Sequence, residues 1–337
     1  MKKYNIAIVG ASGAVGIEII NCLDNLKIPV NNLKLLGSKR SAGNIQQTPF
    51  GDIKIELLDE NSFKNIDFAL FSAGGKISEK FAPIAVKSGA RVIDNSSHFR
   101  YDKNIPLIVP EINSGEIKNA KIIANPNCTT AIASVALFPI YKHFGIKKII
   151  ISTYQATSGG GAKAMQELID STKSYLDGQE FQNKVFSHNI AFNLIPHIDN
   201  FCENDYTKEE MKVTWETQKI FGDENIKISC TAVRIPTIRA HSESVTIETE
   251  KEINPQEVKN LLKKSPGVKV VDNIKNNTYP MPKTATGKYD IEIGRIRQNL
   301  VFGKKGLDLF ISGDQLLKGA ALNAVQILNE IIKTHLN

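Results

Sequence analysis

The stretch IAIVGASGAVG, which begins at Ile6, constrains the fold of this chain more than any other segment. An apolar run of strand character passes through Gly10, Gly13 and Gly16 into a segment with the apolar spacing of a helix. Glycine has no Cβ, so backbone N–H groups at a helix N-terminus can approach a pyrophosphate closely. The motif therefore predicts a dinucleotide-binding strand–turn–helix unit. The alternative is a tight turn that binds no ligand.

Strand-like and helix-like segments alternate from this motif to about residue 125. Short apolar runs occur at 33–37, 53–58, 67–73 and 90–97, and residues 76–89 have helical spacing. Such an alternation is typical of a parallel sheet with helices on both faces.

The pattern changes after Cys128. The runs at 147–159, 227–236 and 243–250 predict longer strands of a mixed or antiparallel sheet. From residue 314 onward the spacing predicts a long amphipathic helix that packs on the first domain. We therefore expect an α/β protein with two domains. Residues 1–127 with 315–337 form a Rossmann-type parallel-sheet domain, and residues 128–314 form an α+β domain with a mixed sheet.

Composition excludes several classes of protein. The net charge is +7, but the lysines are dispersed, so we expect anionic substrates and no nucleic-acid partner. No apolar run approaches the roughly 20 residues that cross a bilayer, which predicts a soluble cytoplasmic protein without a membrane partner. The four cysteines have no C-x-x-C spacing, which predicts neither a disulfide framework nor a metal site.

The turn after residues 33–37 indicates which dinucleotide is bound. NAD sites usually carry an acidic residue there, which binds the ribose hydroxyls. Here the turn offers Ser38, Lys39, Arg40 and Ser41. A cationic turn rich in hydroxyl groups suits a 2′-phosphate, so we predict NADP rather than NAD. The alternative is a solvated basic loop.

Cys128 lies in the stretch NPNCTTAIASVALFPI, at the expected start of a helix. The partial positive charge of a helix N-terminus lowers the pKa of a thiol there and favours the thiolate. A thiolate attacks carbonyl carbons well, so Cys128 is a candidate nucleophile. The alternative is a buried structural cysteine.

Other polar residues could assist this cysteine. In RIPTIRAHSESVTIET, strand alternation would place Arg239 and His241 on one face and Arg234 on the other. The alternative is that a loop around Pro236 rotates Arg234. A histidine beside a thiolate can hold the imidazolium form or shuttle protons. Arg100 follows a parallel strand, where a guanidinium suits a phosphate or carboxylate, and Gln155 precedes a glycine-rich turn.

Taken together, the motifs of the whole chain resemble the aspartate-semialdehyde dehydrogenase family. They are GASGAVG, SKRSAG, DNSSHFR, NPNCTT, TYQATSGGG, WETQKI, RIPTIRAHSESV and GDQLLKGAALNAVQI. The resemblance implies a fold like that of glyceraldehyde-3-phosphate dehydrogenase. It also implies the reversible, NADPH-dependent reductive dephosphorylation of L-aspartyl 4-phosphate to L-aspartate 4-semialdehyde.

The resemblance also implies roles for individual residues. Cys128 would attack the acyl phosphate and form a thioester, and His241 would be the acid/base at the thiohemiacetal oxygen. Gln155 would orient the acyl group, and Asn127 would help to hold the oxyanion.

For the substrate, Arg234 would bind the α-carboxylate and Glu216 the ammonium group, while Lys219 and Arg100 would bind the phosphate. From the residues alone, Glu216 and Lys219 are three apart on a helix and could be an exposed ion pair.

The cofactor would contact residues in both halves of the chain. Gly10, Ser12, Gly13, Ala14 and Val15 would surround its phosphates, and Arg40 and Ser41 its 2′-phosphate. Ser158 and Gly159 would lie near the nicotinamide, and Gln315, which opens the terminal helix, would lie across the cofactor.

The resemblance further implies a homodimer, with a tetramer as the alternative, in the synthesis of lysine, threonine, methionine, isoleucine and diaminopimelate. Rival functions are N-acetyl-glutamyl-phosphate reductase, glyceraldehyde-3-phosphate dehydrogenase and an inactive NADP-sensing protein. The first rival would give Glu216 no ammonium group to bind, and the second favours an acidic residue at the ribose. The retained Cys128, Gln155 and His241 argue against the third.

Overall fold

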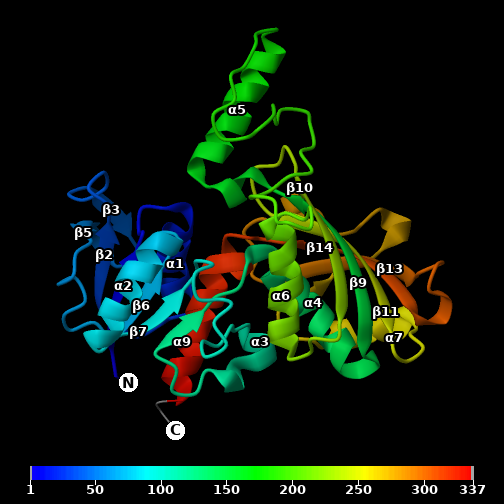
Figure 1. Cartoon of the computed structure of the whole chain (residues 1–337), viewed down its shortest axis with the longest axis horizontal. Helices are drawn as coiled ribbons and strands as arrows, with labels where there is room; N and C mark the ends of the chain where they lie inside the picture. The colour runs from blue at the N-terminus through cyan, green and yellow to red at the C-terminus, as the bar shows by residue number, and fades with distance from the viewer. Residues whose placement is uncertain (1, 335–337) are drawn as a thin grey trace. The chain divides into compact units, whose positions relative to one another are not determined.

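The structure is a computed structural model that describes residues 2–334 (Figure 1). Its contacts divide the chain into two compact units. Unit 1 is Met1–Asn127 with Ala320–Asn337, and unit 2 is Cys128–Gly319. Residues 315–319 thus fall in unit 2, and residues 335–337 of the predicted terminal helix lie outside the described part of the chain.

Unit 1 contains the predicted parallel sheet. Its strand order is β5-β2-β1-β6-β7-β8, and every neighbouring pair is parallel. The strands are β1 (Tyr4–Val9), β2 (Val30–Gly37), β5 (Glu56–Leu57), β6 (Phe68–Phe71), β7 (Arg91–Asp94) and β8 (Ile122–Ala124). β3 (Ile45–Thr48) and β4 (Gly51–Lys54) form a separate hairpin.

The sheet of unit 1 is buried by its helices. They are α1 (Ala14–Asn25), α2 (Gly75–Lys87), α3 (Pro110–Asn113) with the 3-10 turn Ser114–Glu116, and α9 (Leu322–Thr334). α9 contacts α1, α3 and β7, whereas α2 contacts β6 and β7. Every residue of β6 is buried, as expected for a strand covered on both faces. In the core beside it, Phe63 and Phe71 stack with ring centroids 5.9 Å apart, and burying each ring contributes roughly 1.5–3 kcal/mol.

Unit 2 contains the predicted mixed sheet, in the order β10-β9-β11-β14-β13-β12. β9 pairs with β10 and β12 with β13 in parallel, and the other pairs are antiparallel. The strands are β9 (Ile146–Gln155), β10 (Lys227–Arg234), β11 (His241–Thr249), β12 (Val268–Val270), β13 (Ile291–Gln298) and β14 (Gly306–Gly313).

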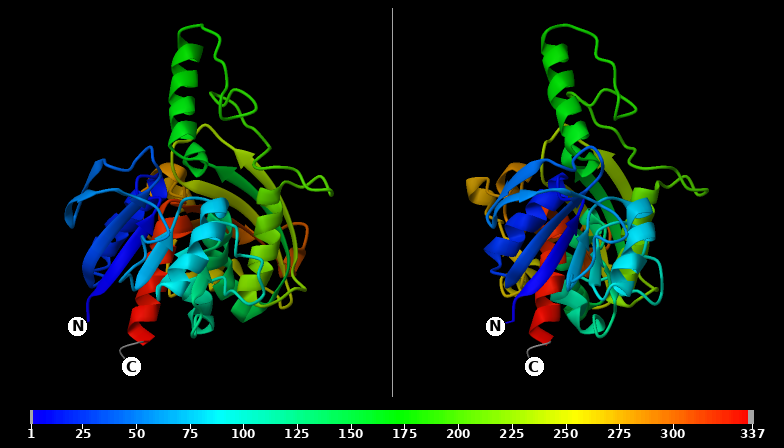
Figure 2. Two further views of the ribbon diagram at one scale, coloured as in Figure 1. Left: turned by 60° about the vertical axis from the view of Figure 1, so that its left-hand side comes forward. Right: turned by 90° about the vertical axis from the view of Figure 1, so that its left-hand side faces the viewer.

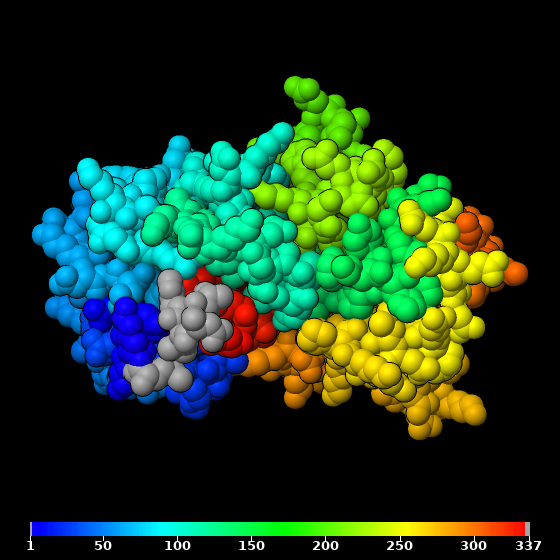
Figure 3. Space-filling model, turned by 90° about the horizontal axis from the view of Figure 1, so that it is seen from below, coloured from blue at the N-terminus to red at the C-terminus, as the bar shows by residue number. Residues whose placement is uncertain are grey.

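One face of this sheet is covered by α4 (Cys128–Phe144), α6 (Lys208–Phe221) and α7 (Pro255–Leu262). α4 is apolar on nearly all sides and mostly buried, as a central core helix should be. The C-terminal end of α4 meets the segment that follows β11 at the surface. There the Lys251 side chain donates to the His143 carbonyl at 2.8 Å. In Figure 3 this is where green, the colour of α4, adjoins yellow, the colour of the segment after β11.

The remaining helices of unit 2 lie outside this layer. α5 (Ala162–Leu176) and the loop after it extend away from the sheet in Figures 1 and 2. Shorter elements are α8 (Pro282–Ala285), the 3-10 turns Thr157–Gly160, Ile274–Asn276 and Gly303–Lys305, and a π-helical turn at Leu317–Ala321. None of the helices in the described residues is both long and apolar enough to cross a membrane.

Two local predictions are wrong. The segment that contains Arg234, Arg239 and His241 is not one strand, because β10 ends at Arg234, β11 begins at His241 and a loop joins them. Strand alternation therefore does not apply across it, and the alternative of a loop around Pro236 is confirmed. The terminal helix does not open at Gln315, because the π-helical turn intervenes and α9 begins only at Leu322.

Candidate active site

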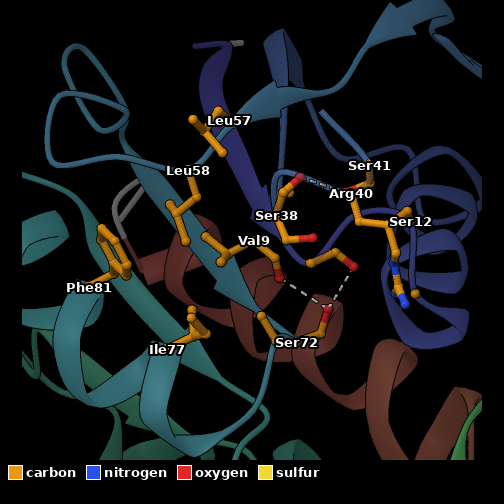
Figure 4. A pocket seen from close by; sticks show the side chains of 14 residues that line it. Val9, Ser12, Ser38, Arg40, Ser41, Leu57, Leu58, Ser72, Ile77 and Phe81 are labelled. Carbon is orange, nitrogen blue, oxygen red and sulfur yellow. Dashed lines mark hydrogen bonds between the residues drawn. The ribbon is translucent and has the colours of Figure 1, made fainter. Parts of the chain in front are cut away.

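A cavity of about 340 Å³ lies at the carboxyl ends of β1, β2 and β6 in unit 1. Figure 4 shows polar side chains on one side of it and apolar ones on the other. Its lining residues are Val9, Gly10, Ser12, Gly13, Gly37, Ser38, Arg40, Ser41, Leu57, Leu58, Ser72, Ala73, Ile77 and Phe81.

The glycine motif shapes this cavity through close backbone contacts. Gly10 has a φ of +87°, and a Cβ there would lie 2.8 Å from the Ser72 carbonyl oxygen. A Cβ on Gly16 would overlap the carbonyl oxygen of Gly10. Gly13 is the N-cap of α1, and no side chain caps that helix start, so its leading N–H groups suit an anionic ligand.

The turn after β2 contributes Ser38, Arg40 and Ser41 to the same cavity. None of the lining residues carries a carboxylate, so the cavity lacks the acidic group that binds the ribose hydroxyls in NAD sites. Ala14 and Val15, by contrast, form the first turn of α1, where they are partly exposed and do not line the cavity.

Arg100 and Asn127 also belong to unit 1, and both are buried. Arg100 Nε donates to the Asn125 carbonyl at 2.8 Å, and its Nη2 donates to the Asn95 carbonyl at 2.7 Å. Because Asn95 follows β7 and Asn125 follows β8, Arg100 lies at the carboxyl edge of the parallel sheet. Asn127 is the last residue before α4.

Cys128 is the first residue of α4 and is partly exposed. The backbone approaches it closely, since a Cβ on Gly319 would lie 2.8 Å from Cys128 Cβ. Cys202 is also partly exposed, whereas Cys22 and Cys230 are buried, and burial raises the pKa of the Cys230 thiol. The exposure of Cys128 argues against a purely structural role.

Gln155, Arg234 and His241 come together at the adjoining ends of β9, β10 and β11. Gln155 pairs with Arg234 in the parallel register, and Ala156 links Arg234 to His241. The Ala156 N–H donates to His241 Nδ1 at 3.0 Å, and the Ala156 carbonyl accepts from Arg234 Nη1 at 2.6 Å. A Cβ on Gly159 would lie 2.9 Å from Arg234 Nη1 and 3.3 Å from His241 Nε2, which explains the glycine there.

The electrostatics of this cluster decide the state of His241. Burial, and then the neighbouring charge of Arg234, hold the pKa of His241 well below its ordinary value. Because Nδ1 accepts a backbone hydrogen bond, the neutral ring carries its proton on Nε2. This geometry therefore favours the neutral ring over the imidazolium form.

Arg234 is also close to two acidic groups. Burial lowers the pKa of the Arg234 guanidinium, while the charges of Glu209 and Cys128 oppose that shift. The Cys128 thiol is therefore near enough to Arg234 for their charges to interact.

Glu209 and Thr153 are site residues that sequence reasoning missed. Gln155 Nε2 donates to Glu209 Oε1 at 3.1 Å, and Thr153 Oγ1 donates to Gln155 Oε1 at 3.0 Å. Lys212 Nζ lies 3.1 Å from Glu209 Oε2. Glu209 lies in the first turn of α6, where an acidic residue is unremarkable, so its sequence position gave no signal.

Glu216 and Lys219 lie on α6, as predicted, but Glu216 is 0% exposed. The alternative of an exposed ion pair is therefore wrong. Lys219 is partly buried one turn later.

Gln315 joins two loops of unit 2. Its Nε2 donates to Ser158 Oγ, and its Oε1 accepts from the Ala240 N–H at 2.7 Å. Arg239 binds Asp314, with Nε 2.7 Å from Oδ2. Among residues 2–334, no group of three or more His, Cys, Asp or Glu side chains is placed to hold a metal ion.

Comparison with known proteins identifies the family. Residues 5–120 match the family model "Semialdehyde dehydrogenase, NAD binding domain", and residues 137–318 match "Semialdehyde dehydrogenase, dimerisation domain". The aspartate-semialdehyde dehydrogenase of Aquifex aeolicus is 50% identical over 335 residues, with 98% of each chain covered. That of Campylobacter jejuni is 48% identical, with 97% of this chain and 96% of the relative covered.

A solved structure extends the comparison to the fold. The crystal structure of aspartate semialdehyde dehydrogenase II from Vibrio cholerae, complexed with ASA, superimposes with a TM-score of 0.94. It is 41% identical, and the match covers 99% of both chains. From these matches, the chain belongs to the aspartate-semialdehyde dehydrogenase family.

Proposed function

We propose that this chain converts L-aspartyl 4-phosphate reversibly to L-aspartate 4-semialdehyde and phosphate, with NADPH as the reductant. The observation that carries the proposal is the site in unit 2. Cys128 opens α4, and its charge acts on Arg234, which is joined through Ala156 to His241. The identity of the relatives supports the same activity.

Cys128 is the nucleophile of this proposal. The N-terminus of α4 and the Arg234 guanidinium both favour a thiolate. The sulfur attacks the acyl carbon, the C–O bond to phosphate breaks, and a thioester remains. NADPH, when bound, supplies the hydride that reduces the thioester carbon. Cleavage of the S–C bond then releases the semialdehyde and returns the thiolate.

His241 acts as a hydrogen-bond donor in this scheme. Its Nδ1 is held by the Ala156 N–H, so Nε2–H is the group available to the substrate oxygen. A neutral donor stabilises the alkoxide of the tetrahedral intermediate, and collapse of that alkoxide to the aldehyde needs no added proton. The low pKa of His241 keeps this donor neutral at physiological pH.

The substrate is positioned by residues on three elements. Thr153 and Glu209 fix the Gln155 amide, so Gln155 can orient the acyl group. Arg234 uses one Nη for the Ala156 carbonyl and offers its remaining donors to the α-carboxylate.

The family resemblance supports the remaining substrate assignments. Glu216, buried on α6, binds the ammonium group, and Lys219 with Arg100 binds the phosphate. Asn127, directly before Cys128, helps to hold the oxyanion.

NADP is the proposed cofactor. The cavity of unit 1 has a glycine cradle, an uncapped helix start and a cationic turn, which fit a dinucleotide with a 2′-phosphate. Gly10, Ser12 and Gly13 of the cavity bind the diphosphate together with the leading N–H groups of Ala14 and Val15. Arg40 and Ser41 bind the 2′-phosphate. Ser158, Gly159 and Gln315 contact the nicotinamide half. Residues 1–127 with 315–337 are then the NADP domain, and residues 128–314 are the catalytic and dimerisation domain.

A homodimer in the cytoplasm completes the proposal. On β9, Ile150 is 50% exposed, and Tyr154 on the same face is partly exposed beside Phe310, with ring centroids 6.1 Å apart. Further exposed apolar side chains follow α5, among them Phe192 and Phe201. A second copy of unit 2 would bury these surfaces. Light scattering after size exclusion separates a dimer from a tetramer.

A spectrophotometric assay tests the activity. We expect NADPH to form from NADP only when both L-aspartate 4-semialdehyde and inorganic phosphate are present. N-acetylglutamate semialdehyde is the matched control, because it lacks the free ammonium group that Glu216 would bind. Faster turnover of the control, or turnover that does not require phosphate, would refute the assignment.

A further inference from the structure

Arg239 has no role in the function proposed above, yet it lies two residues before His241. It belongs to the loop between β10 and β11, and its Nε donates to Asp314 Oδ2 at 2.7 Å. The Asp314 side chain is 0% exposed, whereas that of Arg239 is 24% exposed. A buried carboxylate needs compensating hydrogen bonds, so its other partners show what the pair holds in place.

Asp314 accepts hydrogen bonds with all its oxygen atoms. Oδ2 also accepts from the Gly287 N–H at 2.6 Å, and Oδ1 accepts from the N–H groups of Leu316 and Leu317 at 3.0 and 3.3 Å. Its carbonyl accepts from the Gly319 N–H at 3.2 Å, which starts the π-helical turn Leu317–Ala321. Asp314 thereby fixes the turn that contains Gly319, and the backbone of Gly319 packs closely against Cys128.

A second link lies directly beside the first. Ala240, which follows Arg239, donates its N–H to Oε1 of Gln315, which follows Asp314, at 2.7 Å. Gln315 in turn binds Ser158 Oγ. Two consecutive residues of one segment thus bind two consecutive residues of the other.

Ala240 itself has a φ of +70°, a left-handed conformation that non-glycine residues adopt only when their surroundings enforce it. The residues on either side hold Ala240 in this conformation, because Arg239 is bound to Asp314 and His241 begins β11.

We propose that Arg239 and Asp314 form a positioning pair for the reaction of Cys128. The pair joins the loop before His241 to the turn that packs on Cys128, and so fixes the relative placement of the imidazole, Gln315 and the thiol. Neither residue touches the substrate. The inference rests on the proposed function for its kinetic readout, but its second readout is chemical and does not.

The decisive variant is Asp314→Asn. An amide offers one acceptor in place of two, so it cannot satisfy Arg239 and Gly287 on one side and Leu316 and Leu317 on the other. We expect kcat to fall about 10- to 100-fold, while KM for the semialdehyde changes less than about threefold, because misplaced reacting groups slow the chemical step. The rate of Cys128 alkylation by iodoacetamide, measured without cofactor, should change by at least about threefold.

Arg239→Gln removes the charge but leaves the backbone bonds of Asp314, so it should fold even where Asp314→Asn does not. We expect a smaller loss of kcat in the same direction. Arg239→Lys keeps the charge but not the planar donor, so its kcat should lie between those of Arg239→Gln and the parent.

Asp272→Asn is the matched control. Asp272 is 1% exposed, pairs with Lys259 at 2.7 Å and accepts from the N–H groups of Arg295 and Ile296, but it lies beside the edge strand β12. The Asp272→Asn variant should lower the melting temperature as Asp314→Asn does, but its kcat and its rate of Cys128 alkylation should equal those of the parent.

Two results would overturn the inference. One is a parent-like kcat and alkylation rate in both Asp314→Asn and Arg239→Gln, or in Arg239→Gln alone if the other variant does not fold. The other is an equal effect of Asp272→Asn on both readouts. A parent protein that turns over no semialdehyde would instead refute the proposed function, and the alkylation rates would still decide the positioning role.

Discussion

The nucleotide cavity of unit 1 and the cysteine site of unit 2 are built in opposite ways. The cavity is formed by short turns that follow successive strands, and its glycines act through backbone geometry. The cysteine site is formed by side chains from distant segments, and one of its hydrogen bonds joins residues 85 apart in the chain. The cavity therefore depends mainly on short motifs at the ends of strands, whereas the cysteine site depends on side chains that meet only after unit 2 has folded.

The two sites also differ in electrostatic cost. The cavity exposes its cation Arg40, whereas the cysteine site buries Arg234, His241, Glu209 and Glu216. Buried ionisable groups must be paired or neutral, so each depends on its neighbours. Changes in the cavity of unit 1 should thus affect cofactor affinity alone, while changes in the cysteine site of unit 2 should spread to several kinetic properties.

The largest expected effect comes from Cys128→Ala. Without the nucleophile, kcat should fall by at least about 10⁴-fold, while the Kd for NADPH stays within about twofold of the parent value. Stopped-flow assays and fluorescence titration measure the two quantities. Cys202→Ala removes the other partly exposed thiol and should be fully active. A large change in the Kd for NADPH would contradict the division of labour between the units.

Arg234→Lys should have the next largest effect. A lysine cannot grip a carboxylate with two parallel hydrogen bonds, and it cannot reproduce the contact with the Ala156 carbonyl. We expect KM for the semialdehyde to rise about 30- to 100-fold, with kcat also reduced because the same contact supports His241. Steady-state kinetics with saturating NADP measures both. An unchanged KM would refute the role in carboxylate binding.

Arg40→Ala tests the opposite region. Loss of an exposed charged donor should raise the Kd for NADPH by about tenfold and leave the Kd for NADH nearly unchanged. The kcat at saturating NADPH should equal that of the parent. Equal loss of affinity for both nucleotides would show that Arg40 does not contact the 2′-phosphate.

The smallest effect concerns stability rather than turnover. Glu243 on β11 is fully buried, and neither of its carboxyl oxygens has a hydrogen-bond partner in the described part of the chain. Burial raises the pKa of Glu243 well above its ordinary value of 4.5, so the folded state keeps a proton that the unfolded state loses. Its contribution to stability is full below pH 4.5 and is lost as the pH rises toward the folded pKa.

The Glu243→Gln variant cannot ionise, so its free energy of unfolding should improve relative to the parent as the pH rises from 5 to 8. The slope is at most about 1.4 kcal/mol per pH unit. Urea unfolding at several pH values measures it, and the opposite trend from His241, whose pKa is lowered, cancels in the difference. The exposed Glu252→Gln serves as the control. Parallel pH curves for parent and Glu243→Gln would contradict a neutral Glu243.

The success of prediction follows the same contrast. The parallel sheet, the mixed sheet and the start of α4 at Cys128 were predicted correctly, because hydrophobic periodicity and glycine spacing are local signals. The terminal helix was misplaced, because the hydrogen bonds of Asp314 convert its first turn into a π-helical one. No periodicity reports such a side-chain contact.

The details of the cysteine site needed the structure. Nothing in the sequence around Glu209 indicates that it holds Gln155, since the two residues are 54 positions apart in the chain. Thr153 precedes Gln155 by two residues on β9, but no periodicity reports the hydrogen bond between their side chains. Likewise, the charge state of His241 depends on its burial and on Arg234, and a sequence motif contains neither quantity.

The central step of the proposed reaction is the formation of a thioester at Cys128, and trapping that intermediate tests it directly. The protein is mixed with L-aspartate 4-semialdehyde and NADP without phosphate, quenched in acid and digested for mass spectrometry. We predict one aspartyl adduct, on the peptide that contains Cys128, formed together with one equivalent of NADPH and removed by added phosphate. NADPH formation without an adduct, or an adduct on Cys202 instead, would contradict the account.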